Sequence, residues 1–176
     1  MKYTTLGNTD IKISRICMGC MGFGNAQTGQ HSWTVDEDTT RTIIKRGLEL
    51  GVNFFDTAIA YQAGTSEAFL GRAVKDFAKR DEVVIATKFL PRSQEEIASG
   101  ITGGEHVRRS LDTSLSHLGM DYVDLYIYHM WDWNTPLEEF MEGLADSVKA
   151  GKVRHIGIAN CFAWQLAEAN ALAEKM

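Results

Sequence analysis

Four apolar runs that each end in a polar side chain constrain the fold of this chain more than any other feature. They are VNFFDTA (52–58), VVIATK (83–88), VDLYIYH (123–129) and HIGIAN (155–160), and segments with helical patterns separate them. A parallel sheet closed by helices keeps the middle of each strand apolar and leaves chemistry to the strand ends. The pattern therefore predicts such a sheet, with polar side chains gathered at its carboxyl edge.

The chain alternates between strand and helix patterns five times. We expect strands at Ile16–Met18, Val52–Phe55, Val83–Thr87, Val123–Tyr128 and Arg154–Ile158, and helices over about 34–50, 66–79, 102–119, 135–151 and 162–175. Such alternation favours parallel strand-helix units. Gly7 and Asn8, between short β-prone pieces, predict a β-hairpin within the first fifteen residues.

Capping signals indicate where these helices begin and end. Thr34 with Glu37, and Thr102 with Glu105, have capping-box spacing. The fourth helix should start at Thr135, with Pro136 in the first helical position and Glu138 completing the box. Gly51, Gly119 and Gly151 fit the carboxyl ends of three helices.

The predicted fold class is α/β: a parallel (β/α) barrel of TIM type with an N-terminal β-hairpin. A closed barrel of eight units takes about 250 residues, whereas the 176 residues here hold five. We therefore expect one domain over residues 1–176, truncated at its carboxyl end, whose unpaired sheet edges favour self-association. A doubly wound sheet would need a G-x-G-x-x-G loop, but Gly19, Gly22 and Gly24 are spaced in the wrong order.

Composition narrows the partners and the compartment. A net charge of -5 with intermingled signs argues against nucleic acid. No run approaches the roughly 18 apolar residues of a membrane span, and no secretory signal opens the chain, so we expect a cytoplasmic protein. Cys17, Cys20 and Cys161 should be free thiols. Cys17-x-x-Cys20 lacks a second ligand pair, so we expect no metal site.

Four polar residues near the strand ends make chemical sense as one acid relay. A phenol ordinarily ionises only near pH 10, so Tyr61 can serve as an acid near neutrality only beside a group that stabilises the phenolate. Lys88 could do this, Asp56 could be its counter-ion, and His129 could orient a substrate oxygen. Taken singly, Asp56 could equally close an Asx turn, Tyr61 could be a half-buried loop aromatic and Lys88 a solvated strand end. A histidine such as His129, taken alone, is more often a hydrogen-bonded core residue than a catalyst.

Longer motifs resemble one family. They are GVNFFDTAIAY with Asp56 and Tyr61, GTSEAFLGRAVK, VIATK ending in Lys88, GMDYVDLYIYH ending in His129, TPLEEFMEGLADSVKAGKVRHIGIAN, and the opening LGNTDIKISRICMGCMGFG. In these segments, which cover nearly the whole chain, the sequence resembles the aldo-keto reductases.

The resemblance implies a barrel enzyme that reduces aldehydes or ketones to alcohols with NADPH. It would make Tyr61 the proton donor, supported by Lys88 and Asp56, and His129 the group that positions the carbonyl. Cofactor contacts would come from Gly19, Met21, Asp56 and Asn160; Ala159 stands where the family often has Ser. The family's strands after the fifth, which carry the remaining cofactor contacts, have no counterpart here.

The substrate side is less specific. Trp131 and Trp133 lie past a strand end and, with Phe23, suggest a pocket for an apolar or aromatic small-molecule carbonyl, although the tryptophans could equally serve packing.

Three other functions are compatible with the same residues. The chain could be a barrel that binds cofactor or a partner without turnover. Lys88 could be the Schiff-base nucleophile of an aldolase. The polypeptide could also be a fragment that has no activity apart from a longer enzyme.

Overall fold

A five-stranded parallel sheet forms the centre of the molecule, and the computed structural model describes all 176 residues. Its strands are β3 (Cys17–Gly19), β4 (Phe54–Asp56), β5 (Val84–Phe89), β6 (Val123–Tyr128) and β7 (Val153–Ile158). They lie side by side in chain order, each parallel to the next. A doubly wound sheet would reverse its order at a switch point, so this order confirms a segment of a (β/α) barrel.

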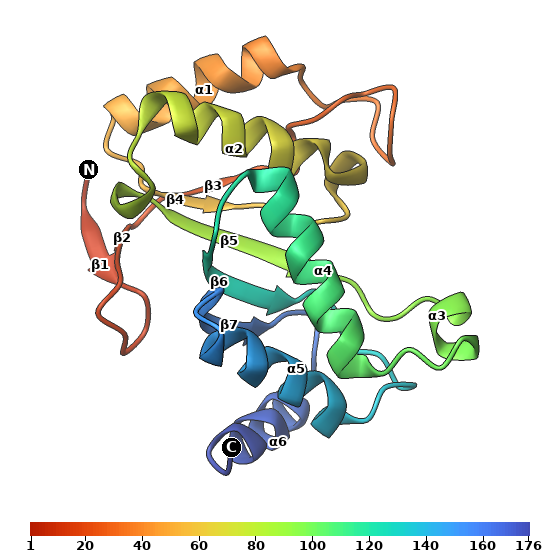
Figure 1. Cartoon of the computed structure of the whole chain (residues 1–176). Helices are drawn as coiled ribbons and strands as arrows, with labels where there is room; N and C mark the ends of the chain where they lie inside the picture. Colours follow the sequence, from red (N-terminus) through yellow and green to blue (C-terminus); the bar gives the residue numbers. More distant parts are fainter.

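Five long helices join and cover these strands. They are α1 (Glu37–Glu49), α2 (Thr65–Phe77), α4 (Gly103–Leu118), α5 (Leu137–Lys149) and α6 (Ala163–Ala173). Helices that are neighbours in this series pack against each other, and Figure 1 shows the series passing around the sheet from α1 to α6. The prediction of five strand-helix units is confirmed.

The core lies between the helices and one face of the sheet. Phe55, Ile85, Phe89, Tyr126 and Tyr128 point to the helices and are almost fully buried. The ring of Phe89 stacks on Tyr126 and Tyr128, with centroids 4.8 and 4.9 Å apart. Successive side chains of a strand point to opposite faces. The same alternation that buries Phe55 and Phe89 therefore turns Asp56 and Lys88 to the other face.

A β-hairpin precedes the sheet, as predicted. Its strands β1 (Tyr3–Thr5) and β2 (Lys12–Ser14) pair antiparallel. The side chain of Asn53 joins the hairpin to the sheet, because it accepts from Ser14 N at 2.6 Å and donates to the carbonyl of Lys12 at 2.9 Å. In Figure 1 the hairpin lies near the amino ends of the strands, whereas the long loops extend from their carboxyl ends.

Two predicted helix starts are wrong. Helix α1 is capped by Asp36, which accepts from Thr39 N at 2.9 Å. The Thr34 hydroxyl is instead engaged within the preceding loop. Pro136 has an extended backbone (φ -54°, ψ 137°) and stands just before α5 instead of in its first turn. Thr135 lies in a preceding turn, in which the side chain of Asp132 accepts from Asn134 N and Thr135 N.

Other local signals behave as predicted. Thr102 caps α4 by accepting from Glu105 N at 3.2 Å, and α4 ends before Gly119, whose φ is 62°. The short helix α3 (Gln94–Ala98), with a capping box between Ser93 and Glu96, was not predicted. The chain also contains two short 3-10 helices, η1 (Tyr61–Gly64) and η2 (Arg80–Glu82).

All three cysteines are free thiols, as predicted. None of the helices combines the length and the apolar character needed to cross a bilayer.

Candidate active site

Asp56, Tyr61 and Lys88 converge at the carboxyl ends of β4 and β5. The ammonium of Lys88 donates to the carboxylate of Asp56, to the carbonyl of Thr57 at 2.8 Å and to the hydroxyl of Tyr61 at 3.2 Å. Only 7% of Lys88 is exposed. A buried charge is tolerated where it is paired and hydrogen-bonded, and here an ammonium with three donors faces three acceptors. Lys88 therefore contributes a fixed positive charge beside the phenol.

Strand pairing continues past the named strands and brings Tyr61 to this ammonium. Thr57 N donates to the carbonyl of Ala86 at 2.9 Å, and Ile59 N to the carbonyl of Lys88 at 3.0 Å. These two bonds hold the segment after β4 along the end of β5. The Tyr61 ring consequently lies 4.8 Å from the Lys88 nitrogen.

His129 completes the group from the end of β6. Its ring packs edge-on against Tyr61, with centroids 5.8 Å apart and an interplanar angle of 79°. Burial and, second, the charge of Lys88 lower the pKa of His129, so the imidazole is neutral near pH 7. Its Nδ1 is buried without a partner. A neutral imidazole donates through one ring nitrogen and accepts through the other.

The residues expected to contact a cofactor lie around the same edge. Gly19 is paired in register with Asp56, and the space where a Cβ would lie on Gly19 is open. Met21, just beyond it, is 38% exposed. Asn160 follows β7 with a left-handed backbone (φ 52°), and its Nδ2 donates to the carbonyl of His129 at 2.7 Å. That bond leaves the amide oxygen of the exposed Asn160 free to accept.

The aromatic residues expected on the substrate side differ in their surroundings. Phe23 is 5% exposed and packs within the main core cluster. Trp131 packs on Phe140 of α5, with centroids 5.9 Å apart. Trp133 is 72% exposed and meets Trp131 and Trp164 at 6.4 and 6.1 Å. Sequence reasoning missed Trp164 because it comes from a separate element, α6.

Sequence reasoning also missed the turn that follows Tyr61. Gln62 and Ala63 both have left-handed backbones, with φ of 48° and 51°. No glycine occupies either position, so nothing in the sequence indicated this conformation.

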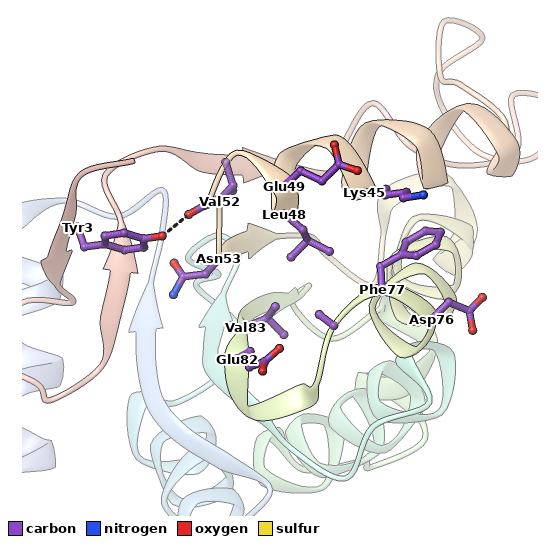
Figure 2. Close-up of a pocket in the computed structure, with 12 residues that line it drawn as sticks. Tyr3, Lys45, Leu48, Glu49, Val52, Asn53, Asp76, Phe77, Glu82 and Val83 are labelled. Carbon is purple, nitrogen blue, oxygen red and sulfur yellow. Dashed lines mark hydrogen bonds between the residues drawn. The ribbon is translucent and has the colours of Figure 1, made fainter.

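A cavity of about 580 Å³ lies away from this group. It is bounded by Tyr3 of the hairpin, Leu48 of α1, Phe77 of α2 and Val83 just before β5 (Figure 2). None of the predicted site residues lines it. The amino-terminal end of a barrel usually serves stability rather than catalysis, and we assign this cavity no part in the chemistry.

Comparisons with known proteins give a consistent picture. The family described as "Aldo/keto reductase family" matches residues 15–176. The chain is 40% identical over 169 residues to norsolorinic acid reductase stcV of Emericella nidulans. The aligned region covers 93% of this chain and 43% of that protein.

Two solved structures are similar in fold. A thermostable aldo-keto reductase, Tm1743, in complex with the inhibitor epalrestat has a TM-score of 0.82 and 32% identity over 97% of this chain and 58% of that one. The holo form of an aldo-keto reductase from Bacillus halodurans has a TM-score of 0.78 and 30% identity, over 96% of this chain and 53% of that one. The chain spans about half the length of the curated relatives it matches.

Proposed function

The chain belongs to the aldo/keto reductase family, and from this premise we propose that the protein is an NADPH-dependent oxidoreductase that reduces aldehydes or ketones to alcohols. The observation that carries the proposal is the contact of the Lys88 ammonium with the Tyr61 hydroxyl at 3.2 Å, inside a group that also holds Asp56 and His129.

Tyr61 would act as the general acid. Its hydroxyl donates a proton to the carbonyl oxygen of the substrate, and the phenolate left behind accepts a hydrogen bond from the Lys88 ammonium. Hydrogen bonds between charged partners are about twice as strong as neutral ones. Because this ammonium is already in position before the proton moves, it stabilises the charge that develops on Tyr61 without a reorganisation of the site.

Asp56 and His129 would support this transfer from two sides. Asp56, with the carbonyl of Thr57, fixes the Lys88 ammonium and compensates its burial. With its proton on Nε2, the neutral His129 would be a hydrogen-bond donor, and a donor beside Tyr61 can hold the substrate oxygen at the phenol. His129 thus orients the carbonyl, while Tyr61 supplies the proton.

The chain's residues fit one end of a nicotinamide cofactor. A Cβ on Gly19 would meet no atom within 4 Å, so the surface beside Asp56 is open to a cofactor. The free amide oxygen of Asn160 can accept from a carboxamide. Met21 is exposed next to this surface. When bound, NADPH supplies the hydride that the carbonyl carbon receives.

The remaining attributes of the protein belong to the same proposal. The substrate would be a small-molecule carbonyl. The exposed Trp133, four residues after His129 in the sequence, offers an aromatic surface, which favours an apolar or aromatic substrate. Free cysteines suit a reducing compartment such as the cytoplasm. β3 and β7 are edge strands of the sheet, and unpaired edges favour association with another strand.

The arrangement of Lys88 argues against the aldolase alternative. A Schiff base requires a neutral amine with a free lone pair. Lys88 Nζ instead lies within hydrogen-bond distance of a carboxylate, a carbonyl and a phenol, and these partners favour the charged ammonium.

The test compares Tyr61→Phe with Tyr3→Phe. Tyr3 lies in the hairpin, where its hydroxyl donates to the carbonyl of Gly51, so the control makes the same substitution at the other end of the sheet. Carbonyl-dependent oxidation of NADPH should be abolished in Tyr61→Phe and retained in Tyr3→Phe. Full turnover by Tyr61→Phe would contradict the role of the phenol.

A titration with NADPH, followed by quenching of tryptophan fluorescence, separates binding from turnover. Saturable binding is expected. Binding without reduction of any member of a broad aldehyde panel would favour the non-catalytic alternative.

A further inference from the structure

The backbone directly after Tyr61 adopts a conformation that its residues disfavour. Gln62 (φ 48°, ψ 48°) and Ala63 (φ 51°, ψ 41°) are left-handed, and Gly64 follows with φ 84°. In the left-handed region the Cβ of a residue other than glycine lies too close to the following carbonyl oxygen. Such residues persist only where the surrounding structure holds them. Some contact must therefore keep this turn in place.

The Gln62 side chain provides that contact. It is 1% exposed, and its partners all lie in the loop of residues 20–36 that joins β3 to α1. Its Oε1 accepts from His31 N at 2.9 Å. Its Nε2 donates to the carbonyls of Asn25 and His31 at 2.9 and 2.8 Å, and lies 3.2 Å from the hydroxyl of Thr34. The amide is thus fully hydrogen-bonded inside the loop.

The loop is shaped around this one side chain. Gly24 (φ 133°) and Gly29 (φ 101°) approach Gln62 so closely that a Cβ on either would lie 2.6 Å from its Cβ or Cα atom. The turn and the loop are also joined through Thr65, whose hydroxyl accepts from Asn25 N at 2.9 Å and donates to the carbonyl of Gln62 at 2.7 Å. Loop and turn therefore form one packed unit.

We propose that Gln62 is a positioning residue for Tyr61, because its amide holds the left-handed turn against the 20–36 loop and so keeps the phenol at Lys88. The inference rests on the proposed function for the role of Tyr61, but the coupling itself is a property of this fold. Without the amide, the turn is free to leave the left-handed region. The Tyr61 hydroxyl, one residue earlier, then loses its fixed distance to the Lys88 ammonium.

Gln62→Met tests the proposal, since methionine has a similar length but no amide. Gln27→Met is the matched control, because Gln27 is an exposed residue of the same loop whose side chain makes no hydrogen bond to the turn. Both proteins, and the parent, would be labelled with 3-fluorotyrosine. Of the five tyrosine resonances, that of Tyr61 is identified by its loss in Tyr61→Phe. Chymotryptic cleavage after Trp33, which is 58% exposed in the loop, reports on loop opening.

In Gln62→Met we expect the Tyr61 fluorine resonance to shift or broaden. Cleavage after Trp33 should become about ten- to a hundredfold faster, because the 20–36 loop opens more often once its buried hydrogen bonds to the Gln62 amide are lost. In the NADPH-dependent assay kcat should fall with little change in KM for NADPH. Gln27→Met should match the parent in every measurement.

Faster cleavage with an unchanged Tyr61 resonance would overturn the proposal, since the amide would then hold only the loop. If Gln62→Met does not fold, Thr34→Val removes one of the amide's partners and leaves the turn residues intact. It should move the same resonance in the same direction, and an unchanged resonance would again overturn the proposal. The fluorine and cleavage results do not require turnover, so they distinguish failure of this coupling from failure of the proposed reductase activity.

Discussion

Replacing Asp124 with Asn should destabilise the fold through the loss of one buried charge. Asp124 is 1% exposed at the start of β6. Its Oδ2 accepts from Arg80 Nη2 at 2.7 Å and from Ile85 N at 2.9 Å, and its Oδ1 forms an ion pair with Arg154 Nη1 at 3.1 Å. Both guanidinium groups lie over the ring of Tyr122, at 3.9 and 4.6 Å. One carboxylate thus joins β5, β6, β7 and the η2 turn.

The magnitude follows from what an amide cannot replace. Asn retains one acceptor oxygen, so its NH₂ group must face either Arg154 or the pair formed by Arg80 and Ile85 N. Removing one member of a buried ion pair costs about 3–5 kcal/mol. The side chains of Arg80 and Arg154 are 21% and 50% exposed, so water can solvate them in part. We therefore expect about 3 kcal/mol, which corresponds to a fall in Tm of roughly 6–12 °C for a domain of this size.

Denaturant and thermal unfolding would measure this loss, with Asp112→Asn as the control. Asp112 pairs with Lys152 at 2.6 Å, but both side chains are well exposed, at 60% and 44%. An exposed ion pair contributes about 0–1 kcal/mol, and that contribution should disappear in high salt. Equal losses of stability in the two variants would refute the argument that burial makes the contribution of Asp124 to the free energy of unfolding large.

Three further outcomes are expected. In the proposed mechanism, Lys88→Met removes the charge that would stabilise a Tyr61 phenolate, so kcat should fall by roughly thirty- to a hundredfold. An unchanged kcat in a steady-state assay would contradict that mechanism. Burial lowers the pKa of His129, so the unfolded chain binds its proton more tightly; stability should be complete above about pH 6.5 and be lost as pH falls further. His129→Asn should flatten that loss in unfolding curves taken over a pH series. Trp131→Ala should cost about 3 kcal/mol because Trp131 packs on Phe140, while Trp133→Ala, at an exposed position, should cost under about 1 kcal/mol in the same assay.

Most of the architecture could be predicted because its signals are local. The spacing of apolar residues within a short stretch of sequence predicts a strand or a helix. Thr102 and Gly119 show the same for helix ends, since each acts on backbone groups within a few residues. Where two local signals competed, the contact that decided between them was not local. Thr34 failed as a cap because Gln62, 28 residues away, engages its hydroxyl, and Asp36 caps the helix instead.

The candidate site divides in the same way. Asp56, Lys88 and His129 could be identified because each follows an apolar strand, and parallel strands bring their carboxyl ends to one edge. Gln62 and Trp164 could not, because their importance comes only from what lies against them. The sequence around Gln62 does not predict a left-handed turn, and the sequence around Trp164 does not predict its contact with Trp133.

The sequence by itself therefore determined the order of the strands and helices, the face to which each strand side chain points, and the set of residues able to hold and move a proton. Only the tertiary structure decided which partner each of them meets: the Lys88 ammonium with Tyr61, the Gln62 amide with the 20–36 loop, and the Asp124 carboxylate with two arginines. The physical reason is range. Backbone propensity and side-chain alternation act over a few residues, whereas these contacts join residues about 27 to 44 positions apart, and their geometry exists only once the sheet has formed.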